Sequence, residues 1–109
     1  MKKRGSVSPE LASKVIARAS RCCESCGIGV YVGEIHHIVG RHVEATEENL
    51  IYLCEACHRG ENGCHGRDGA PLRLSMRLAL QEKYYRQGKT EDEVRKLMGG
   101  MIYINKESK

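Results

Sequence analysis

The chain has no tryptophan and no phenylalanine, so five tyrosines are its only large aromatic side chains. Its 109 residues are enough for one domain, but with so few bulky side chains they can build only a thin hydrophobic core. Such a domain needs a further source of stability. A structural metal ion can supply it, because the free energy of metal binding becomes free energy of folding.

Long apolar runs are also missing. No segment is apolar over the roughly 20 residues that a membrane-spanning helix needs, and the sequence carries no secretory or lipidation signal. We therefore expect a soluble protein of the reducing cytoplasm, without a membrane partner. In that compartment the six cysteines are expected to bind metal rather than form disulfides.

The excess of positive charge is small: 18 lysines and arginines against 14 acidic residues give a formal charge of +4. This balance permits a polyanionic partner without requiring one. Arginines are spread through the middle of the chain, whereas six of the 14 acidic residues are concentrated at 44–48 and 91–93. Arginine suits bidentate contacts with phosphate, although a solvated surface charge is the alternative for each of them.

Local signals divide the chain into short elements. Ser8 and Pro9 predict the start of a helix at 9–21, and Thr90 with Glu93 predicts a capping box that opens a last helix ending at Gly99. Residues rich in β-formers predict a strand or strand pair at 30–38. The other predicted elements are an apolar run at 50–53 (a second strand or the entry to a helix), a helix at 54–59, an irregular glycine-rich stretch at 60–69, a helix at about 72–87 and a short strand at 101–104.

Cysteines form the strongest local pattern, in two Cys-x-x-Cys pairs: Cys23/Cys26 and Cys54/Cys57. Each pair can form a knuckle that points two sulfurs at one ion, and two knuckles together make a tetrahedral zinc site. We predict structural zinc on these four thiolates. The alternatives are four unrelated thiols or a redox pair, which would more often be a single pair at a helix start.

Two cysteines remain outside these pairs. Cys22 lies one residue too far from Cys26 for the common knuckle, and we expect Cys64 to be only a small residue in the glycine-rich turn.

The histidines lie between and just after the cysteine pairs. His36 and His37 are neighbours on the predicted strand, and because side chains alternate along a strand, the two imidazoles should diverge. They suit a division of labour, and Asn49 and His58 follow later in the chain. An imidazole can act as a general base near neutral pH, while two others with water can hold a divalent cation against a phosphate.

In this order, the residues resemble those of the HNH endonucleases with the ββα-metal fold. The matching stretches lie within about 20–66 and are Cys23-x-x-Cys26, Glu34-Ile-His36-His37-Ile38, Glu48-Asn49-Leu50 and Leu53-Cys54-x-x-Cys57-His58. The helical region 72–98 and the following Gly99-Gly100 are similar to the C-terminal region of small phage or prophage members, which implies a bacterial or phage-encoded protein.

This resemblance implies the fold class and the domain organisation. We expect an α+β fold in which a small zinc-stapled ββα-metal core at 23–66 is flanked by an N-terminal helix in 1–22 and a C-terminal helical extension at 70–109. The whole chain, 1–109, would then be a single HNH nuclease domain.

The resemblance also implies catalytic roles. His37 matches the general base, Asn49 the residue that orients its imidazole by accepting from the other ring N–H, and His58 a metal ligand. His36 occupies the other ligand position, where many members have aspartate. An all-imidazole pair is softer than an aspartate–histidine pair, so it favours transition metals over Mg²⁺.

The third metal ligand is left open between Asn62, one helical turn after His58, and His65. We favour His65, because Gly60 interrupts the helix that would have to continue to Asn62. Arg41 follows the histidine pair and is expected to bind a DNA phosphate, the alternative being a loop salt bridge with an acidic neighbour.

The implied activity is metal-dependent hydrolysis of DNA phosphodiester bonds, by nicking or with weak sequence specificity. The expected cofactors are structural Zn²⁺ and a catalytic Mg²⁺, Mn²⁺, Co²⁺, Ni²⁺ or Zn²⁺, with no small-molecule cofactor, in a monomer or homodimer. Two other classes of function compete with this hypothesis: a non-catalytic zinc-ribbon module that binds nucleic acid, and a thiol redox protein.

Overall fold

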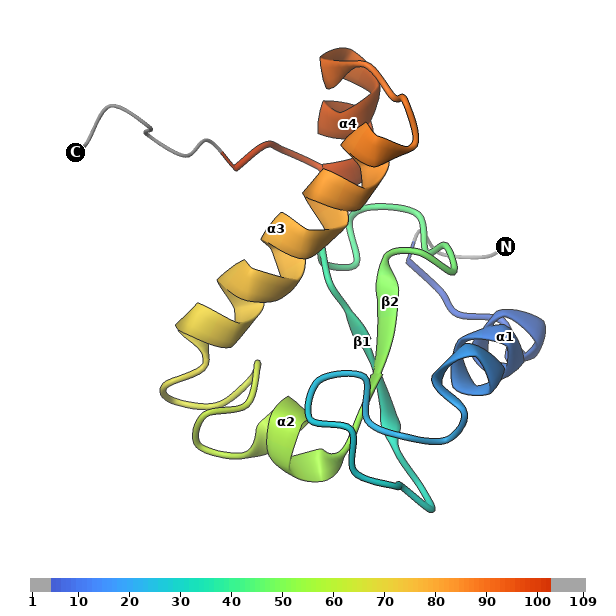
Figure 1. Ribbon diagram of the computed structural model, residues 1–109, viewed down its shortest axis with the longest axis vertical. Coiled ribbons are helices and arrows are strands. Elements are labelled where there is room, and N and C mark those ends of the chain that lie inside the picture. The colour runs from blue at the N-terminus through green and yellow to red at the C-terminus, as the bar shows by residue number, and fades with distance from the viewer. Residues whose placement is uncertain (1–4, 103–109) are drawn as a thin grey trace.

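A small antiparallel sheet lies at the centre of the computed structural model, which describes residues 5–102 (Figure 1). Its strands are β1 (Glu34–His37) and β2 (Leu50–Leu53). Within the described residues four helices surround the sheet: α1 (Pro9–Ala19), α2 (Glu55–Arg59), α3 (Ala70–Arg86) and α4 (Glu91–Met98). Because β1, β2 and α2 follow one another and α1 and α3 flank them, the predicted α+β class with a ββα core is confirmed (Figure 1).

The helix ends follow the predicted capping signals. The Ser8 side chain caps α1, and Thr90 and Glu93 form the reciprocal capping box of α4. Helix α1 ends two residues earlier than predicted, because Ser20 and Arg21 adopt the left-handed conformation with φ angles of 54° and 57°. This turn redirects the chain from the helix into the first cysteine pair.

The strand predicted at 30–38 is only partly correct, because β1 begins at Glu34. Upstream of it the chain pairs with itself: Cys22 and Gly29 form an isolated β-bridge, and the Val30 N–H donates to the Arg21 carbonyl at 2.9 Å. The strand predicted at 101–104 is not formed at residues 101 and 102, and 103–104 lie outside the described residues.

The register of the sheet sends alternate side chains to two sides. Ile35 pairs with Tyr52, and this side packs on α1. His36 pairs with Ile51, on the side that faces α2 and α3. The prediction that the two neighbouring histidines diverge is therefore confirmed, since His37 belongs to the α1 side.

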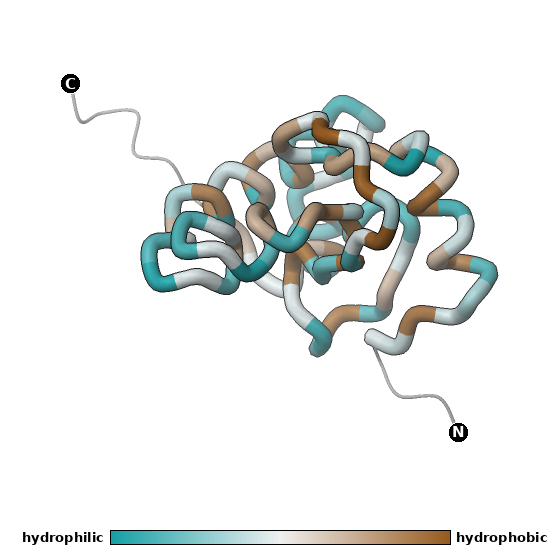
Figure 2. The backbone as a smooth tube through the Cα atoms, turned by 90° about the horizontal axis from the view of Figure 1, so that it is seen from below, coloured by the Kyte–Doolittle hydropathy of each residue, from teal (hydrophilic) through white to brown (hydrophobic). Residues whose placement is uncertain are grey.

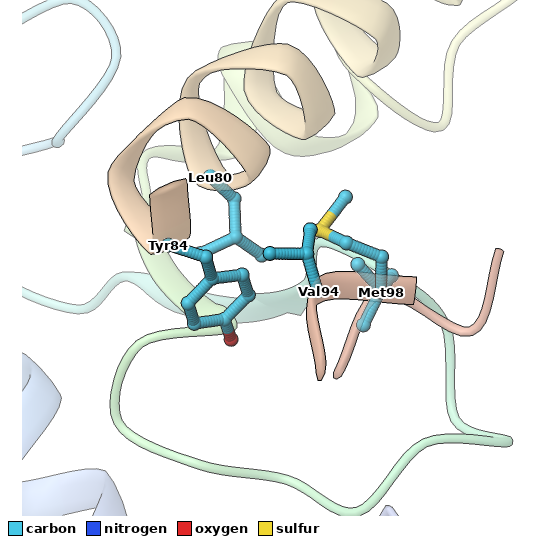
Figure 3. Packing of buried hydrophobic residues seen from close by; sticks show 5 residues of the cluster. Leu80, Tyr84, Val94 and Met98 are labelled. Carbon is cyan, nitrogen blue, oxygen red and sulfur yellow. The ribbon is translucent and has the colours of Figure 1, made fainter. Parts of the chain in front are cut away.

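A separate apolar cluster joins α3 to α4 and lies at the far end of α3 from α2 (Figures 1 and 3). Leu80 and Tyr84 of α3 face Val94 and Met98 of α4, and each of the four is at most 4% exposed. Val39, in the loop after β1, completes this cluster. The C-terminal helices are thus anchored to the loop that connects the two strands.

Polar and apolar residues alternate in short stretches along the chain (Figure 2). Among residues 5–102, none of the helices has the length and apolar character needed to cross a membrane.

Candidate metal centres

Four cysteines converge where the loop after α1 meets the start of α2. Their sulfurs all lie within 4.8 Å of one another, and the Sγ atoms of Cys26 and Cys54 are 3.8 Å apart. A tetrahedral zinc ion with Zn–S bonds of about 2.3 Å separates its sulfurs by about 3.8 Å. The predicted set, Cys23, Cys26, Cys54 and Cys57, therefore has the spacing and the chemistry of a structural zinc site.

Local backbone structure aims these sulfurs. Gly27 closes the first knuckle with a φ of 85°, and its N–H donates to the Cys23 carbonyl at 2.8 Å. The Cys26 N–H donates to the Cys23 sulfur at 3.4 Å. In the second knuckle Cys54 is the N-cap of α2, and its sulfur accepts from the Cys57 N–H at 3.5 Å. The second pair is thus held by the helix start that the sequence predicts.

The pKa values of two of these thiols, Cys23 and Cys57, are shifted in opposite directions. Burial opposes the thiolate of Cys23, but hydrogen bonds from the backbone of Cys26, Cys54 and Ser25 outweigh burial and lower its pKa to about 6. Burial and hydrogen bonds among the neighbouring thiols raise the pKa of Cys57 to about 12. The Cys23 thiolate is therefore favoured and the Cys57 thiolate is opposed, and a divalent cation bound among the sulfurs would stabilise the thiolate form of both.

Glu24, inside the first knuckle, anchors the cysteine cluster to the rest of the fold. Its N–H donates to the Tyr52 carbonyl at 2.8 Å, and the Tyr52 N–H donates to its carboxylate at 2.9 Å. The Arg18 guanidinium donates to both carboxylate oxygens, at 2.9 and 2.7 Å, and to the Leu50 carbonyl at 2.8 Å. These bonds connect α1 and β2 to the loop that carries Cys23 and Cys26.

A second cluster of ligand atoms lies between β1, α2 and the loop that follows α2. One ligand atom from each of His36, His58, Cys64 and His65 lies within 4.8 Å of the others. The three imidazoles pack edge to face, with ring centroids 4.7 to 5.4 Å apart. His36 and His58 are only 6% and 8% exposed, whereas His65 is exposed and leaves the cluster accessible from solvent.

The distances within this cluster fit a metal ion. Nδ1 of His36 lies 3.2 Å from Nε2 of His65. A tetrahedral zinc ion with Zn–N bonds of about 2.05 Å holds two nitrogens about 3.3 Å apart. The donor set therefore fits a divalent transition metal by both spacing and chemistry.

The glycine-rich loop brings His65 to this cluster by folding back on the end of α2. The Cys64 N–H donates to the Cys57 carbonyl and the His65 N–H donates to the His58 carbonyl, each at 2.8 Å. These bonds satisfy carbonyl groups that a helix end leaves without partners. From α3, the Arg73 guanidinium donates to the Cys64 carbonyl at 2.7 Å.

Of the two alternatives for the third ligand, the structure brings His65 into the cluster. Asn62 is exposed and is not among the clustered ligand atoms of the described residues. Gly60 ends α2 with an extended ψ of 174°, so the helix does not continue to Asn62. The predicted interruption by Gly60 is therefore correct.

Glu34 orients His58 within the cluster. Its carboxylate contacts Nδ1 of His58 and accepts from Nε of Arg59 at 3.0 Å. A carboxylate can only accept, so Nδ1 of His58 carries the hydrogen and Nε2 keeps its lone pair for a metal. The hydrogen bond with His58, supported by the charge of Arg59, lowers the pKa of Glu34 and keeps it ionised.

Burial also keeps two of the imidazoles neutral. It is the main reason that the pKa of His36 falls to about 4, with further contributions from the nearby His65 and His58. Burial and the charges of His58 and Arg73 likewise lower the pKa of His65. Neutral imidazoles are the form that binds metals, so both side chains are ready to act as ligands near pH 7.

His37, on the other side of β1, contacts the N-terminal segment. Its Nε2 lies 2.7 Å from the carbonyl oxygen of Gly5. Because a carbonyl only accepts, Nε2 carries the hydrogen in this contact and Nδ1 is the basic nitrogen. Gly5 is buried with a φ of 87°, and a side chain at this position would collide with the backbone of Arg41. The segment is therefore held close to His37 in a conformation that glycine allows.

Asn49 has partners other than the predicted one. Its Oδ1 accepts from the Thr46 N–H and its Nδ2 donates to the Glu44 carbonyl, each at 2.9 Å. Its backbone carbonyl accepts from the Ile38 N–H at 2.9 Å. Within residues 5–102 no hydrogen bond joins its side chain to His37. Asn49 thus shapes the loop between the strands and the point at which β1 ends.

Arg41 is exposed, in the loop that follows His37. Among the ion pairs of residues 5–102 it has none, so the loop salt bridge considered as its alternative role is not formed there. A hollow of about 440 Å³ lies elsewhere, between β2 and α3, and its walls include Ile51, Leu72 and Met76. It contains none of the histidines.

Two residues of this region were not singled out by the sequence. Cys64 was expected to be a space-filling residue, yet its sulfur lies with the three imidazoles. Gly5 has no motif around it, and only the folded chain places its carbonyl beside His37. The adjacency of Cys64 to His65 was the one available signal for the first of these.

The comparison with known families agrees with the geometry. No curated protein matches the sequence. The family model described as HNH endonuclease matches residues 23–63, which include both cysteine pairs, His36, His37 and His58. Such a domain supports a nuclease or another nucleic-acid function with a metal site. Residues 23–63 of this chain therefore match the HNH endonuclease family, and the four cysteines within them cluster at zinc-binding distance.

Proposed function

We propose that this chain is a metal-dependent DNA endonuclease that hydrolyses phosphodiester bonds. The observation that carries the proposal is the convergence of His36, His58 and His65 at metal-ligand spacing, with His36 and His58 inside the segment that matches the HNH endonuclease model. Two further observations support the same conclusion, since both are typical of metal ligands. Burial keeps the His36 imidazole neutral, and the Glu34 carboxylate accepts a hydrogen bond from Nδ1 of His58.

The three imidazoles would hold one divalent cation, through Nδ1 of His36 and Nε2 of His58 and His65. When bound, the cation supplies positive charge that stabilises the phosphate and the leaving 3′ oxygen. An all-imidazole set favours Co²⁺, Ni²⁺ or Zn²⁺ over Mg²⁺. Glu34 fixes the tautomer and the ring orientation of His58, which is what a metal ligand requires.

His37 acts as the general base in this proposal. The Gly5 carbonyl holds the hydrogen on Nε2, so Nδ1 accepts a proton from water. The water oxygen forms a bond to phosphorus while the bond from phosphorus to the 3′ oxygen breaks, and that oxygen takes a proton from solvent. The products are a 5′ phosphate and a 3′ hydroxyl. The Gly5 carbonyl also stabilises the imidazolium that His37 becomes.

Other residues would position the reaction. Arg41, exposed in the loop that follows His37, binds a phosphate of the DNA backbone. Asn49 holds the loop between the strands, so it acts on His37 through the backbone. The four cysteines bind a structural zinc ion that ties the loop after α1 to the start of α2, and so positions His58.

Backbone contacts carry little sequence information, so we propose nicking or weakly specific cleavage, with each chain acting as one nuclease domain. A monomer would cut one strand and a homodimer both.

The test is cleavage of a labelled duplex after all metals have been chelated and Mn²⁺, Co²⁺, Ni²⁺, Zn²⁺ or Mg²⁺ has been added back. The wild type should produce nicks that DNA ligase reseals, because resealing needs a 5′ phosphate and a 3′ hydroxyl. His37→Ala should abolish cleavage, and His42→Ala, which changes an exposed histidine outside both clusters, should not. Salt-dependent DNA binding without cleavage under every metal would reject the nuclease and favour a zinc-ribbon binding module.

A further inference from the structure

Cys64 is a fully buried thiol that the proposed reaction does not use. Its side chain is 0% exposed, and its sulfur lies within 4.8 Å of the ligand nitrogens of His36, His58 and His65. It belongs to neither Cys-x-x-Cys pair, and the four-cysteine cluster is complete without it. Four donors around one point are what a tetrahedral ion requires.

The position of this thiol relative to the imidazoles is fixed by the backbone. The N–H groups of Cys64 and His65 both donate to α2, and Arg73 of α3 donates to the Cys64 carbonyl. The sulfur itself is held only weakly, by a contact of 3.7 Å to the His58 carbonyl. It can therefore turn toward a metal without breaking a strong hydrogen bond.

We propose that Cys64 is a fourth, metal-selective ligand of the histidine site. This inference rests on the proposed function, because it uses the same three imidazoles. An ion of borderline hardness, such as Zn²⁺ or Co²⁺, forms a bond to the Cys64 sulfur as the S–H bond breaks, and the proton passes to the buffer. A hard ion such as Mn²⁺ or Mg²⁺ leaves the thiol protonated and is held by the imidazoles and water.

The consequence is that the identity of the metal decides whether a coordination position stays open. Three imidazoles and one thiolate close a tetrahedral site, as in structural zinc centres, whereas three imidazoles leave room for a phosphate oxygen. Zn²⁺ at this site would thus be bound tightly in a closed form, and a hard ion more weakly in an open form.

Cobalt absorption tests this directly. The protein is first given one equivalent of Zn²⁺, which the four-thiolate site takes, and then Co²⁺. The wild type should show a thiolate-to-cobalt charge-transfer band in the near ultraviolet together with the intense visible bands of tetrahedral cobalt. Cys64→Ala should keep visible cobalt absorption and lose the charge-transfer band, and Cys22→Ala, outside both clusters, should keep both.

Affinity gives a second readout. Loss of the sulfur should weaken Zn²⁺ binding at this site by about tenfold or more, and change Mn²⁺ binding by less than about twofold. Cobalt that displaced zinc from the four cysteines would also give a charge-transfer band. His58→Ala controls for this, because it removes a ligand of the histidine site only, so a charge-transfer band that persists in this variant comes from the four-cysteine site.

The wild-type spectrum decides the matter even if Cys64→Ala fails to fold. Cobalt bound after zinc loading without a charge-transfer band would overturn the role of Cys64 and leave the imidazole site intact. No cobalt bound beyond the cysteine site would overturn this inference and the metal site of the proposed nuclease together.

Discussion

Replacing Glu34 by glutamine tests whether the histidine cluster is built to hold a metal. The Glu34 carboxylate contacts Nδ1 of His58, and the amide of glutamine can still accept this hydrogen bond but carries no charge. Loss of a partner behind a metal-binding histidine costs 10- to 100-fold in metal affinity, about 1.4 to 2.7 kcal/mol. Since the Glu34 side chain is 33% exposed, solvent screens its charge, and we expect the lower end: a loss of about tenfold.

Calorimetric titration of zinc-loaded protein with Mn²⁺ or Ni²⁺ measures this loss. Glu61→Gln is the matched control, because Glu61 also pairs with an arginine but is not among the clustered ligands of the described residues. It should leave the metal affinity unchanged. Equal affinities of Glu34→Gln and the wild type would refute the view that the carboxylate prepares His58 for a metal.

The same carboxylate makes an acid-dependent contribution to stability. The hydrogen bond with His58 and the charge of Arg59 lower the pKa of Glu34 in the folded state. The folded protein therefore gains stability above the ordinary pKa of a glutamate, and loses it as the pH falls through the lowered value. Thermal melting of the metal-free protein should depend less on pH in this acidic range for Glu34→Gln than for the wild type.

Three further predictions follow from the site. Cys54→Ser should lose the structural zinc and unfold at lower temperature, because it removes a metal ligand while serine can still cap α2; a zinc content equal to that of the wild type, measured by metal analysis, would exclude this ligand set. Gly5→Ala should slow cleavage by about tenfold or more, because its strained, colliding side chain displaces the carbonyl that holds His37, while Gly29→Ala, with open space around it, should have no effect. Arg41→Ala should weaken duplex binding and make it less dependent on salt, measured by anisotropy; an unchanged salt dependence would remove Arg41 from the interface.

Local signals predicted most of the helices because helix ends depend on neighbouring residues. The Ser8 and Thr90 caps start helices where expected, and the doubled Cys-x-x-Cys spacing identified the four clustered sulfurs. The strand was predicted too long, because β-forming composition cannot show that residues upstream of Glu34 pair with the residues that follow α1 instead.

The parts of the site that escaped prediction depend on contacts between distant segments. Cys64 reaches the imidazoles only because the glycine-rich loop folds back on α2, and a glycine-rich sequence has no periodicity to reveal this. The Gly5 carbonyl meets His37 across 32 residues of sequence. The resemblance implied a hydrogen bond between the Asn49 side chain and His37. In the structure this side chain bonds instead to Thr46 and Glu44 of its own loop.

The most direct measurement of the central claim is relaxation of supercoiled plasmid by the zinc-loaded protein, with and without an added divalent metal. The account predicts nicking that requires the added metal, is absent in His37→Ala, and falls steeply in a His36→Ala variant that still folds and retains its structural zinc. Plasmid that stays supercoiled with every metal, in the presence of folded wild-type protein, would contradict it.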